Sequence, residues 1–389
     1  MDANQSKKLF TYSIILLMFT GALCSATQGT LLTSYIDYYK LQSSSQGLMS
    51  SMQSAGNLAA LLLIGLLVGK LEKTAIVMLS AITIPLVFFL LGTRPPFFLL
   101  LAGFLVYGVA FGIQDSLASA LMVDLNAEQS GKYMNLLHGV FGLSGLAAPV
   151  FYSFLMERGM PWNGVLTLVA CVCTVSCVVY IVLRSRAKRQ FQGGITLIRK
   201  IGLKDIKRFL SERRKALLLC TAFLFGAHQI GISSWIMRFV SVDIGAPAYG
   251  ALALSMFWAG TAVSRLVSTL IPFARTKKIF LGFLCTSIFI TVGVVAKNGL
   301  LMVVCCLLAG LSEGPILPLM LDMSCTWERE NTSLGSTMLL FALYIGFIIM
   351  PVLIGKVAAL VSLSAAMMMT VLASILGGVL AAGLIRKDV

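Results

Sequence analysis

The chain has 389 residues, of which 58% are hydrophobic and only 12% charged, and its formal net charge is +15. Soluble domains carry roughly 25% charged residues, so a water-soluble globular protein is excluded and the lipid bilayer must be the solvent. The positive charge does not point to nucleic acid, because the basic residues form no recognition pattern.

Windows of ~20 residues predict twelve transmembrane helices. The first begins in an apolar run that is too long for the core of a signal peptide and has no convincing cleavage site before a soluble domain. The predicted spans cover about residues 10–36, 46–68, 74–92, 97–122, 135–156, 162–184, 216–241, 247–271, 277–296, 299–322, 332–355 and 360–385. The sequence therefore predicts an all-α membrane protein.

One long polar segment, residues 184–215, separates the sixth predicted helix from the seventh and carries twelve basic residues. Basic loops remain in the cytoplasm, so both termini, each six spans away, are expected there too. This orientation places 23 of the 30 Lys and Arg residues inside and six outside, with Arg265 within a span. The segment is either an amphipathic helix on the inner membrane face or a solvated connector between two bundles.

The stretch GIQDSLASALMVD at residues 112–124 has a near-echo, GLSEGPILPLMLD, at residues 310–322. Each places an acid at the fourth position of apolar sequence, and the offset of 198 residues is about half the chain. Six spans, a basic linker and six more spans predict parallel repeats, the layout of major facilitator transporters. We therefore expect two six-helix bundles, residues 1–184 and 216–389, joined by a cytoplasmic linker at residues 185–215.

The echo places two acids deep in the membrane. Asp115 and Glu313 lie nine residues, ~13 Å along a helix, inward from Asp124 and Asp322 at the cytoplasmic ends of the fourth and tenth spans. An acid near the centre of a ~30 Å hydrocarbon slab costs on the order of 3 kcal/mol, so two of them suggest a use. Such an acid can hold a proton and release it when water or a cation arrives. The alternative is a protonated acid that only bonds to a neighbouring helix.

Several further segments carry a resemblance to a known family. They are FGIQDSLASALMVD followed by NLLHGVFGLSGLAAP in the fourth and fifth spans, FLFGAHQIGISSW in the seventh, FWAGTAVSR in the eighth and EGPILP in the tenth. Together they resemble the fucose–galactose–glucose:proton symporter group of the major facilitator superfamily. The resemblance implies the major facilitator fold and proton-coupled transport of a sugar or a related solute between the two bundles.

The sequence also departs from that group. Ser119 stands where the group often has Asn, Gln229 where its seventh helix often has Glu, and Ser264 where its eighth helix has Gly. Gly69 replaces the Asp of the loop motif that follows the second helix. Without the seventh-helix Glu and with Glu313 in the tenth, the proton site has moved or the ligand differs from the group's sugars.

Besides the two acids, five side chains are candidates for binding the solute. His138 and Gln229 belong to the matched motifs, and Gln28 and Gln114 lie on helices that line the cavity in this fold. Trp235 either stacks on a sugar ring or belongs to an interface belt. The alternative for the amides and His138 is hydrogen bonding between helices. His228 and Gln229 are adjacent and point ~100° apart, so only one is expected to face the cavity.

Five charged residues lie toward the predicted cytoplasmic face: Lys70, Asp124, Lys132, Arg265 and Asp322. We expect them to act as gate charges that exchange partners while the bundles rock. Anchoring at the membrane interface is the alternative for each of them.

The sequence predicts a secondary active transporter that takes up a small polar solute with protons. An exporter of amphipathic or drug-like compounds by proton antiport is the main alternative, and a membrane sensor of the same fold is a third. No catalytic arrangement or phosphate-binding loop appears, and the nine cysteines lack metal-ligand spacing, so neither an enzyme, an ATP-driven pump nor a metal site is expected. We expect a monomer in the cytoplasmic membrane, driven by the proton gradient without a cofactor, with lipid and solute as its partners.

Overall fold

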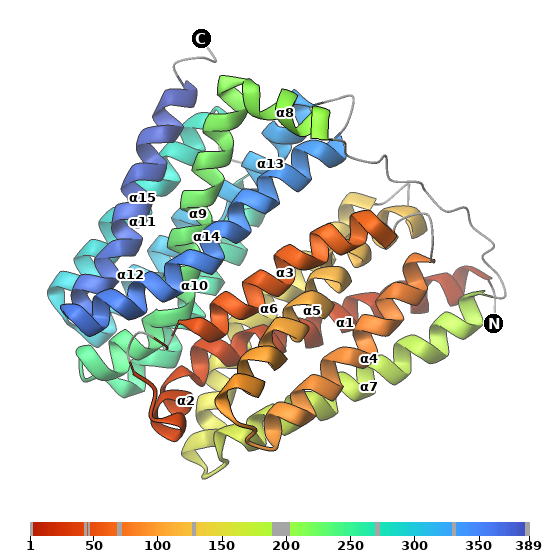
Figure 1. Cartoon of the computed structure of the whole chain (residues 1–389), viewed down its shortest axis with the longest axis horizontal. Helices are drawn as coiled ribbons and strands as arrows, with labels where there is room; N and C mark the ends of the chain where they lie inside the picture. The colour runs from red at the N-terminus through yellow and green to blue at the C-terminus, as the bar shows by residue number, and fades with distance from the viewer. Residues whose placement is uncertain are drawn as a thin grey trace. The chain divides into compact units, whose positions relative to one another are not determined.

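The computed structural model describes residues 3–42, 45, 47–67, 72–126, 130–188, 203–268, 273–328 and 332–385. Within these ranges the regular structure is helical and no strand occurs, as the sequence predicts. The helices, labelled in Figure 1, are α1 (Ala3–Thr30), α2 (Leu32–Tyr39), α3 (Leu48–Leu67), α4 (Lys73–Gly92), α5 (Phe97–Leu125), α6 (Ser130–Glu157), α7 (Trp162–Lys188), α8 (Leu203–Ser211), α9 (Arg213–Arg238), α10 (Pro247–Val267), α11 (Arg275–Ala296), α12 (Gly299–Glu313), α13 (Ile316–Trp327), α14 (Thr332–Leu360) and α15 (Leu363–Ile385), with a π-helical turn, η3 (Phe239–Asp243), after α9.

Ten segments of the described chain are helical, long and apolar enough to cross a membrane. They coincide with ten of the twelve predicted spans, the tenth predicted span corresponding to α12 and α13 together. The other two predicted spans correspond to α3, whose apolar part is the shorter segment Leu48–Ile64, and to α10. The chain is thus a multi-pass membrane protein.

Two predicted spans are interrupted in the structure. The first was expected to continue to residue 36, but α1 ends at Thr30 and α2 begins after a bend at Leu31. The tenth was expected to be continuous, but α12 ends at Glu313 and α13 starts after Pro315. Proline has no backbone N–H and its ring clashes with the carbonyl four residues earlier, so a helix readily breaks there.

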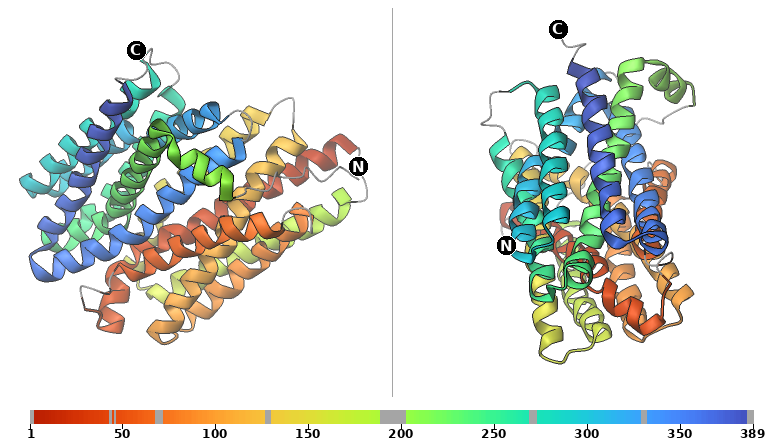
Figure 2. Two further views of the ribbon diagram at one scale, coloured as in Figure 1. Left: turned by 45° about the horizontal axis from the view of Figure 1, so that its top comes forward. Right: turned by 90° about the vertical axis from the view of Figure 1, so that its left-hand side faces the viewer.

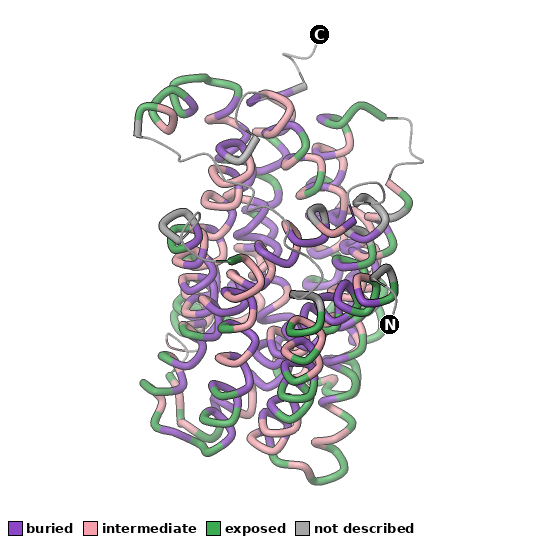
Figure 3. The backbone as a smooth tube through the Cα atoms, turned by 90° about the vertical axis from the view of Figure 1, so that its right-hand side faces the viewer, coloured by how far each residue is buried: buried purple, intermediate pink, exposed green. Residues whose placement is uncertain are grey.

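By its internal contacts the chain divides into two units. Unit 1 comprises residues 1–27 and 55–198, and unit 2 comprises residues 28–54 and 199–389. Along the helices of each unit, buried residues alternate with exposed ones in Figure 3, as expected for helices that turn one face to their neighbours. The predicted bundles at residues 1–184 and 216–389, with the linker at 185–215, stay a prediction.

Close glycine contacts join α3 to α5 within unit 1. A Cβ placed on Gly56 would collide with the backbone of Leu105 and Val109, and one on Gly112 would meet Asn57 and Ala60. Small residues let helix backbones approach this closely in a membrane, where van der Waals packing drives helix association. The contact fixes the register between the two helices.

The same contact recurs within unit 2 between α10 and α12. A Cβ on Gly260 would collide with the backbone of Leu307 and Leu311, and one on Gly314 with Thr261 and Ser264. The α10 residues at this contact therefore correspond to the α3 residues 204 positions earlier. The α12 residues correspond to the α5 residues 202 positions earlier. The repeat between halves is thus present in the backbone contacts.

The end of the basic segment is part of unit 2. Helix α8 buries Phe209 completely in a hydrophobic cluster with residues of α9 and α13, and Ile206 packs against it. Figure 2 shows α8, in light green, crossing the end of α9. Above Phe209 lies the ammonium of Lys215, 5.0 Å from the ring centroid. The last part of the predicted linker is therefore a docked helix, and residues 189–202 lie outside the described residues.

Candidate functional site

Glu313 is the centre of a buried polar cluster in unit 2. Its side chain is 0% exposed, and Gln229 of α9 donates a hydrogen bond from Nε2 to Glu313 Oε1 at 3.0 Å. Thr261 of α10 lies 3.4 Å from the same oxygen, although its hydroxyl also bonds to the carbonyl of Phe257 at 2.9 Å. The glycine contact between α10 and α12 brings Thr261 this close. The acid is therefore held by three helices of one unit.

His228 of α9 contacts the second oxygen of the same carboxyl group. Its Nε2 lies 3.3 Å from Glu313 Oε2, and both side chains are completely buried. The imidazole is also enclosed by aromatic rings, with centroids at 5.3 Å for Phe225 and 5.6 Å for Phe283. We expected only one of His228 and Gln229 to face the cavity. Both lie beside Glu313, because Gln229 binds one oxygen of its carboxyl group and His228 lies near the other.

Arg265 connects the cluster to the helix break. Its Nε donates to the carbonyl oxygen of Gly314 at 3.2 Å, and its guanidinium interacts electrostatically with Glu313. Gly314 must be small, because any Cβ there would meet the backbone of Thr261. Arg265 was predicted to be a gate charge, and the structure places it against the residue that follows the acid.

Asp115 occupies a different environment in unit 1. It lies on α5, and its Oδ1 is buried without a hydrogen-bond partner among the described residues. His138 of α6 interacts with it electrostatically, and that histidine is exposed. A carboxyl oxygen that is buried but unpaired normally requires a water molecule, a ligand or a proton. Asp115 and His138 were both predicted site residues, and the structure brings them together.

The two acids do not occupy equivalent positions. The α12 residue Gly310 repeats Gly108 at the contact with its partner helix, which gives the offset of 202 residues. At that offset Glu313 corresponds to Phe111, four residues before Asp115, or about 6 Å along the helix. The 198-residue echo therefore matches similar letters at positions that differ by one helical turn.

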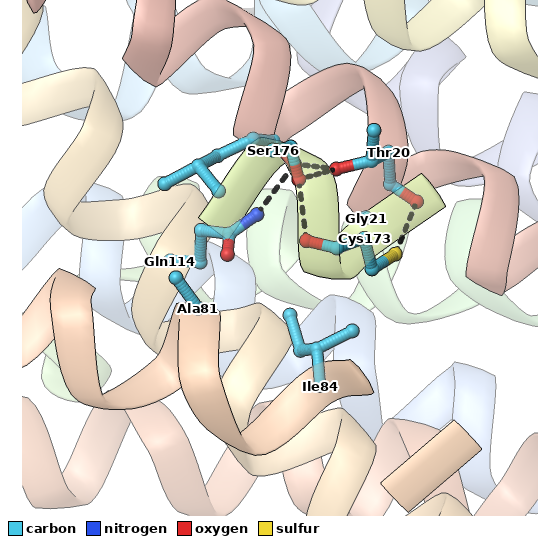
Figure 4. A pocket seen from close by; sticks show the side chains of 8 residues that line it. Thr20, Gly21, Ala81, Ile84, Gln114, Cys173 and Ser176 are labelled. Carbon is cyan, nitrogen blue, oxygen red and sulfur yellow. Dashed lines mark hydrogen bonds between the residues drawn. The ribbon is translucent and has the colours of Figure 1, made fainter. Parts of the chain in front are cut away.

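Gln114 belongs to the helix packing of unit 1 in the described structure. Its Nε2 donates to the carbonyl of Leu17 at 2.8 Å, while its Oε1 is buried without a partner in the described part of the chain. Figure 4 shows the crevice that it lines with Thr20, Cys173 and Ser176, whose hydroxyl lies 2.9 Å from that of Thr20. The crevice has no room for a water molecule, and contact of Gln114 with a solute stays a prediction.

Gln28 and Trp235 are the remaining predicted solute ligands. Nε2 of Gln28 donates to the carbonyl of Met49 at 3.4 Å, a contact within unit 2. Trp235 is 0% exposed, and its indole Nε1 lies buried without a partner among the described residues. A tryptophan of an interface belt would be exposed, so the structure disfavours that alternative. Contact of either residue with a solute stays a prediction.

The other predicted gate charges are only partly accounted for. Asp322 is about half exposed and pairs with Arg275 at 3.0 Å. Asp124 lies on α5 and Lys132 on α6, but their side chains lie outside the described ones, and Lys70 lies outside the described residues altogether. A gating role for this set stays a prediction.

Sequence reasoning favoured Gln229 over its neighbour His228 and did not single out Thr261, and both of these residues belong to the cluster. The available signal was the composition, because the chain has only two histidines. Each contacts or interacts with one of the two buried acids, His138 with Asp115 and His228 with Glu313. Thr261 had no comparable signal, since hydroxyl residues are frequent in membrane helices.

Long apolar helices that enclose ionisable residues define a multi-pass membrane protein of the kind in which such residues mark a functional site. The sequence matches the Major Facilitator Superfamily over residues 14–295, and the chain belongs to that family. This confirms the predicted fold class. No curated protein sequence matches the chain.

Solved structures of other transporters share the fold. The fucose:proton symporter FucP of E. coli, as a point variant, has 14% sequence identity and a TM-score of 0.65, with 99% of each chain covered. A bacterial homologue of the human lysosomal transporter Spinster has 14% identity and a TM-score of 0.77, covering 98% of this chain and 97% of its own. The nucleoside transporter NupG, also a variant, has 12% identity and a TM-score of 0.77, with 97% and 99% covered. At these identities the likeness shows the fold alone.

Proposed function

We propose that this transporter takes up a small polar solute, a sugar or a related metabolite, together with protons by alternating access. The observation that carries the proposal is the buried, unpaired Oδ1 of Asp115 beside the exposed imidazole of His138. A carboxyl group in this position can exchange a proton and can accept a hydrogen bond from a solute hydroxyl.

The sequence motifs and one of the structural relatives support a sugar as the solute. The matched fourth-helix and fifth-helix motifs, which contain Asp115 and His138, resemble those of sugar symporters, and FucP is a fucose:proton symporter. The nucleoside carried by NupG also presents hydroxyl groups, so a nucleoside belongs to the same range of candidates. Gln28, Gln114 and Trp235 are the additional residues that we assign to solute binding.

The proton gradient supplies the energy in this proposal. Asp115 and Glu313 are the two proton carriers, and no bound cofactor takes part. The transporter acts as a monomer in the cytoplasmic membrane with both termini in the cytoplasm. The excess of basic residues in the loops on that side supports this orientation.

Proteoliposomes test the proposal directly. Vesicles containing the wild-type protein are given an inward proton gradient and a panel of radiolabelled sugars and nucleosides, preselected by the thermal stabilisation that binding produces. We expect accumulation of at least one solute above its external concentration. Asp115→Asn and Glu313→Gln should each abolish accumulation but retain exchange or binding, because only the coupled proton is lost.

Glu157→Gln is the matched control, since this acid is exposed at the end of α6. It should accumulate solute like the wild type. Normal accumulation by both Asp115→Asn and Glu313→Gln would disprove the coupling assignment. Extrusion of amphipathic compounds in exchange for protons would instead favour the exporter.

A further inference from the structure

Glu313 and His228 face one another with polar atoms that bind no other group of the described structure. Glu313 Oε2 and both imidazole nitrogens of His228 are buried and have no hydrogen-bond partner in the described residues. The closest approach between them is the 3.3 Å from Nε2 to Oε2. A small movement of either side chain would form a hydrogen bond there, with a proton between nitrogen and oxygen.

The surroundings limit where that proton can go. Phe225 and Phe283 enclose the imidazole, and Gln229 occupies the other oxygen of Glu313 as a donor. Buried polar groups at this depth are costly unless paired, so the imidazole and the carboxyl group stabilise one another. The pair therefore has two arrangements, one with an additional proton shared between Nε2 and Oε2 and one with a carboxylate that accepts Nε2–H.

Among the described residues, one charged group interacts with the pair. Arg265 of α10 interacts electrostatically with Glu313, and its Nε bonds to the carbonyl of Gly314. Helix α11 contributes Phe283, and the other helices packed on α9, among them α8, α13, α14 and α15, add no charged group that interacts with either side chain in the described structure. Loss of the shared proton to water leaves one negative charge on the pair, and the guanidinium of Arg265 balances it.

We propose that His228 is the proton partner and positioning residue of Glu313, so that unit 2 contains a carboxyl–imidazole proton site of its own, separate from Asp115. This inference rests on the proposed proton coupling and assigns its second site to two side chains. Because Arg265 interacts electrostatically with Glu313 and bonds to the carbonyl of Gly314, the charge of the pair acts on the break between α12 and α13. His228 does not contact the solute in this mechanism.

Infrared difference spectroscopy of the purified full-length protein tests the site without a solute. The carboxylic C=O band of Glu313, assigned by its loss in Glu313→Gln, is followed across the neutral pH range. His228→Gln retains an N–H donor near the position of Nε2 but cannot accept a proton. We expect its Glu313 band to titrate about one pH unit lower, a tenfold weaker hold on the proton. His138→Gln, which replaces the other histidine, should leave the band where it is.

A second measurement avoids dependence on the folding of His228→Gln. Because the chain has two histidines, ¹⁵N-histidine labelling of the wild-type protein gives two sets of imidazole signals. One set should change its titration in Glu313→Gln and the other should not. In transport, His228→Gln should shift the pH profile of accumulation, and in the Glu313→Gln background it should add nothing, as expected when one residue acts through the other.

The outcomes separate this inference from the proposed function. If wild-type vesicles accumulate solute but neither the infrared band nor the imidazole signals link His228 to Glu313, the inference is wrong and proton coupling stands. If the titrations link the two residues but a proton gradient drives no transport, the site exists and the proposed function is wrong.

Discussion

Each unit contains the same kind of glycine contact between two of its helices, α3 and α5 in unit 1 and α10 and α12 in unit 2. The acidic residues beside these contacts have different surroundings. In unit 1 the acid Asp115 has a buried oxygen without a partner in the described structure and an exposed histidine. In unit 2 Glu313 and its histidine are both fully buried, and Gln229 binds one carboxyl oxygen. The difference suggests a division of roles. In our proposal Asp115 exchanges with solute and water, while Glu313 keeps its proton in the buried pair with His228.

The shared contact can be tested by adding a single methyl group, and this is the largest effect we expect. Gly310→Ala places a Cβ against the backbone of Phe257, and Gly56→Ala places one against the backbone of Leu105. Backbone atoms cannot rotate away, so each change should cost about 3 kcal/mol of stability. Thermal unfolding in detergent measures the effect. Gly139→Ala is the control, since within the described structure its added Cβ has no neighbour within 4 Å beyond the adjacent backbone of its own helix. A loss there equal to that of Gly310→Ala would contradict the packing argument.

A smaller loss of stability is expected when ion pairs at the predicted cytoplasmic ends of the two units are broken, and the loss should differ between the units. In unit 2, Lys215 is almost completely buried and contacts Glu328 at 2.6 Å, while Arg208 of α8 pairs with the same carboxylate. Glu328→Gln should cost about 2 kcal/mol, because the buried ammonium loses a partner that Glu212 replaces only in part.

The unit 1 counterpart is the pair of Arg184 and Glu72 at 3.1 Å, in which Glu72 is 48% exposed. Glu72→Gln should cost only about 0.5 kcal/mol, because Glu72 is half exposed and water reaches the pair although Arg184 is largely buried. Denaturant titrations of the two variants give the comparison. Equal losses would show that α8 is not held to unit 2 by this cluster.

The smallest effect concerns the two buried glutamines. Gln229→Met removes the 3.0 Å donor of Glu313 and should cost about 1 kcal/mol. Gln114→Met removes a bond to the carbonyl of Leu17, which the hydroxyl of Thr20 also contacts at 3.2 Å, so its stability should barely change. Melting temperatures of the two purified variants decide this. A greater loss for Gln114→Met would reverse our view of which amide supports an acid.

The sequence was sufficient to predict the helices and the family, because hydropathy over ~20 residues is a strong signal and the fifth-helix motif is specific. Asp115 and His138 were both candidate site residues, and the structure shows an electrostatic interaction between them. The register of the repeat, that is, the offset between equivalent residues of the two halves, could not be predicted from the sequence. Similar residues 198 positions apart suggested equivalent acids, whereas the glycine contacts, which depend on backbone approach, fix the offset between α5 and α12 at 202.

The cluster around Glu313 was only partly predictable for a related reason. Helical periodicity tells which way His228 and Gln229 point, but the reach of a glutamate side chain between them depends on how closely α9 and α12 pack. The burial of Phe209 was equally hidden, since the basic residues around it favoured a connector or a surface helix. In each case the deciding quantity was a distance between helices far apart in the chain.

The mismatch between glycine register and acid position has a practical consequence. Equivalent positions in the two halves are found by superimposing one half on the other. For this chain the superposition must match Gly108 with Gly310 and Gly112 with Gly314, the residues that make the same backbone contact. Matching Asp115 with Glu313 instead would shift one helix by a full turn. Side chains would then stand where the glycines allow the two backbones to touch.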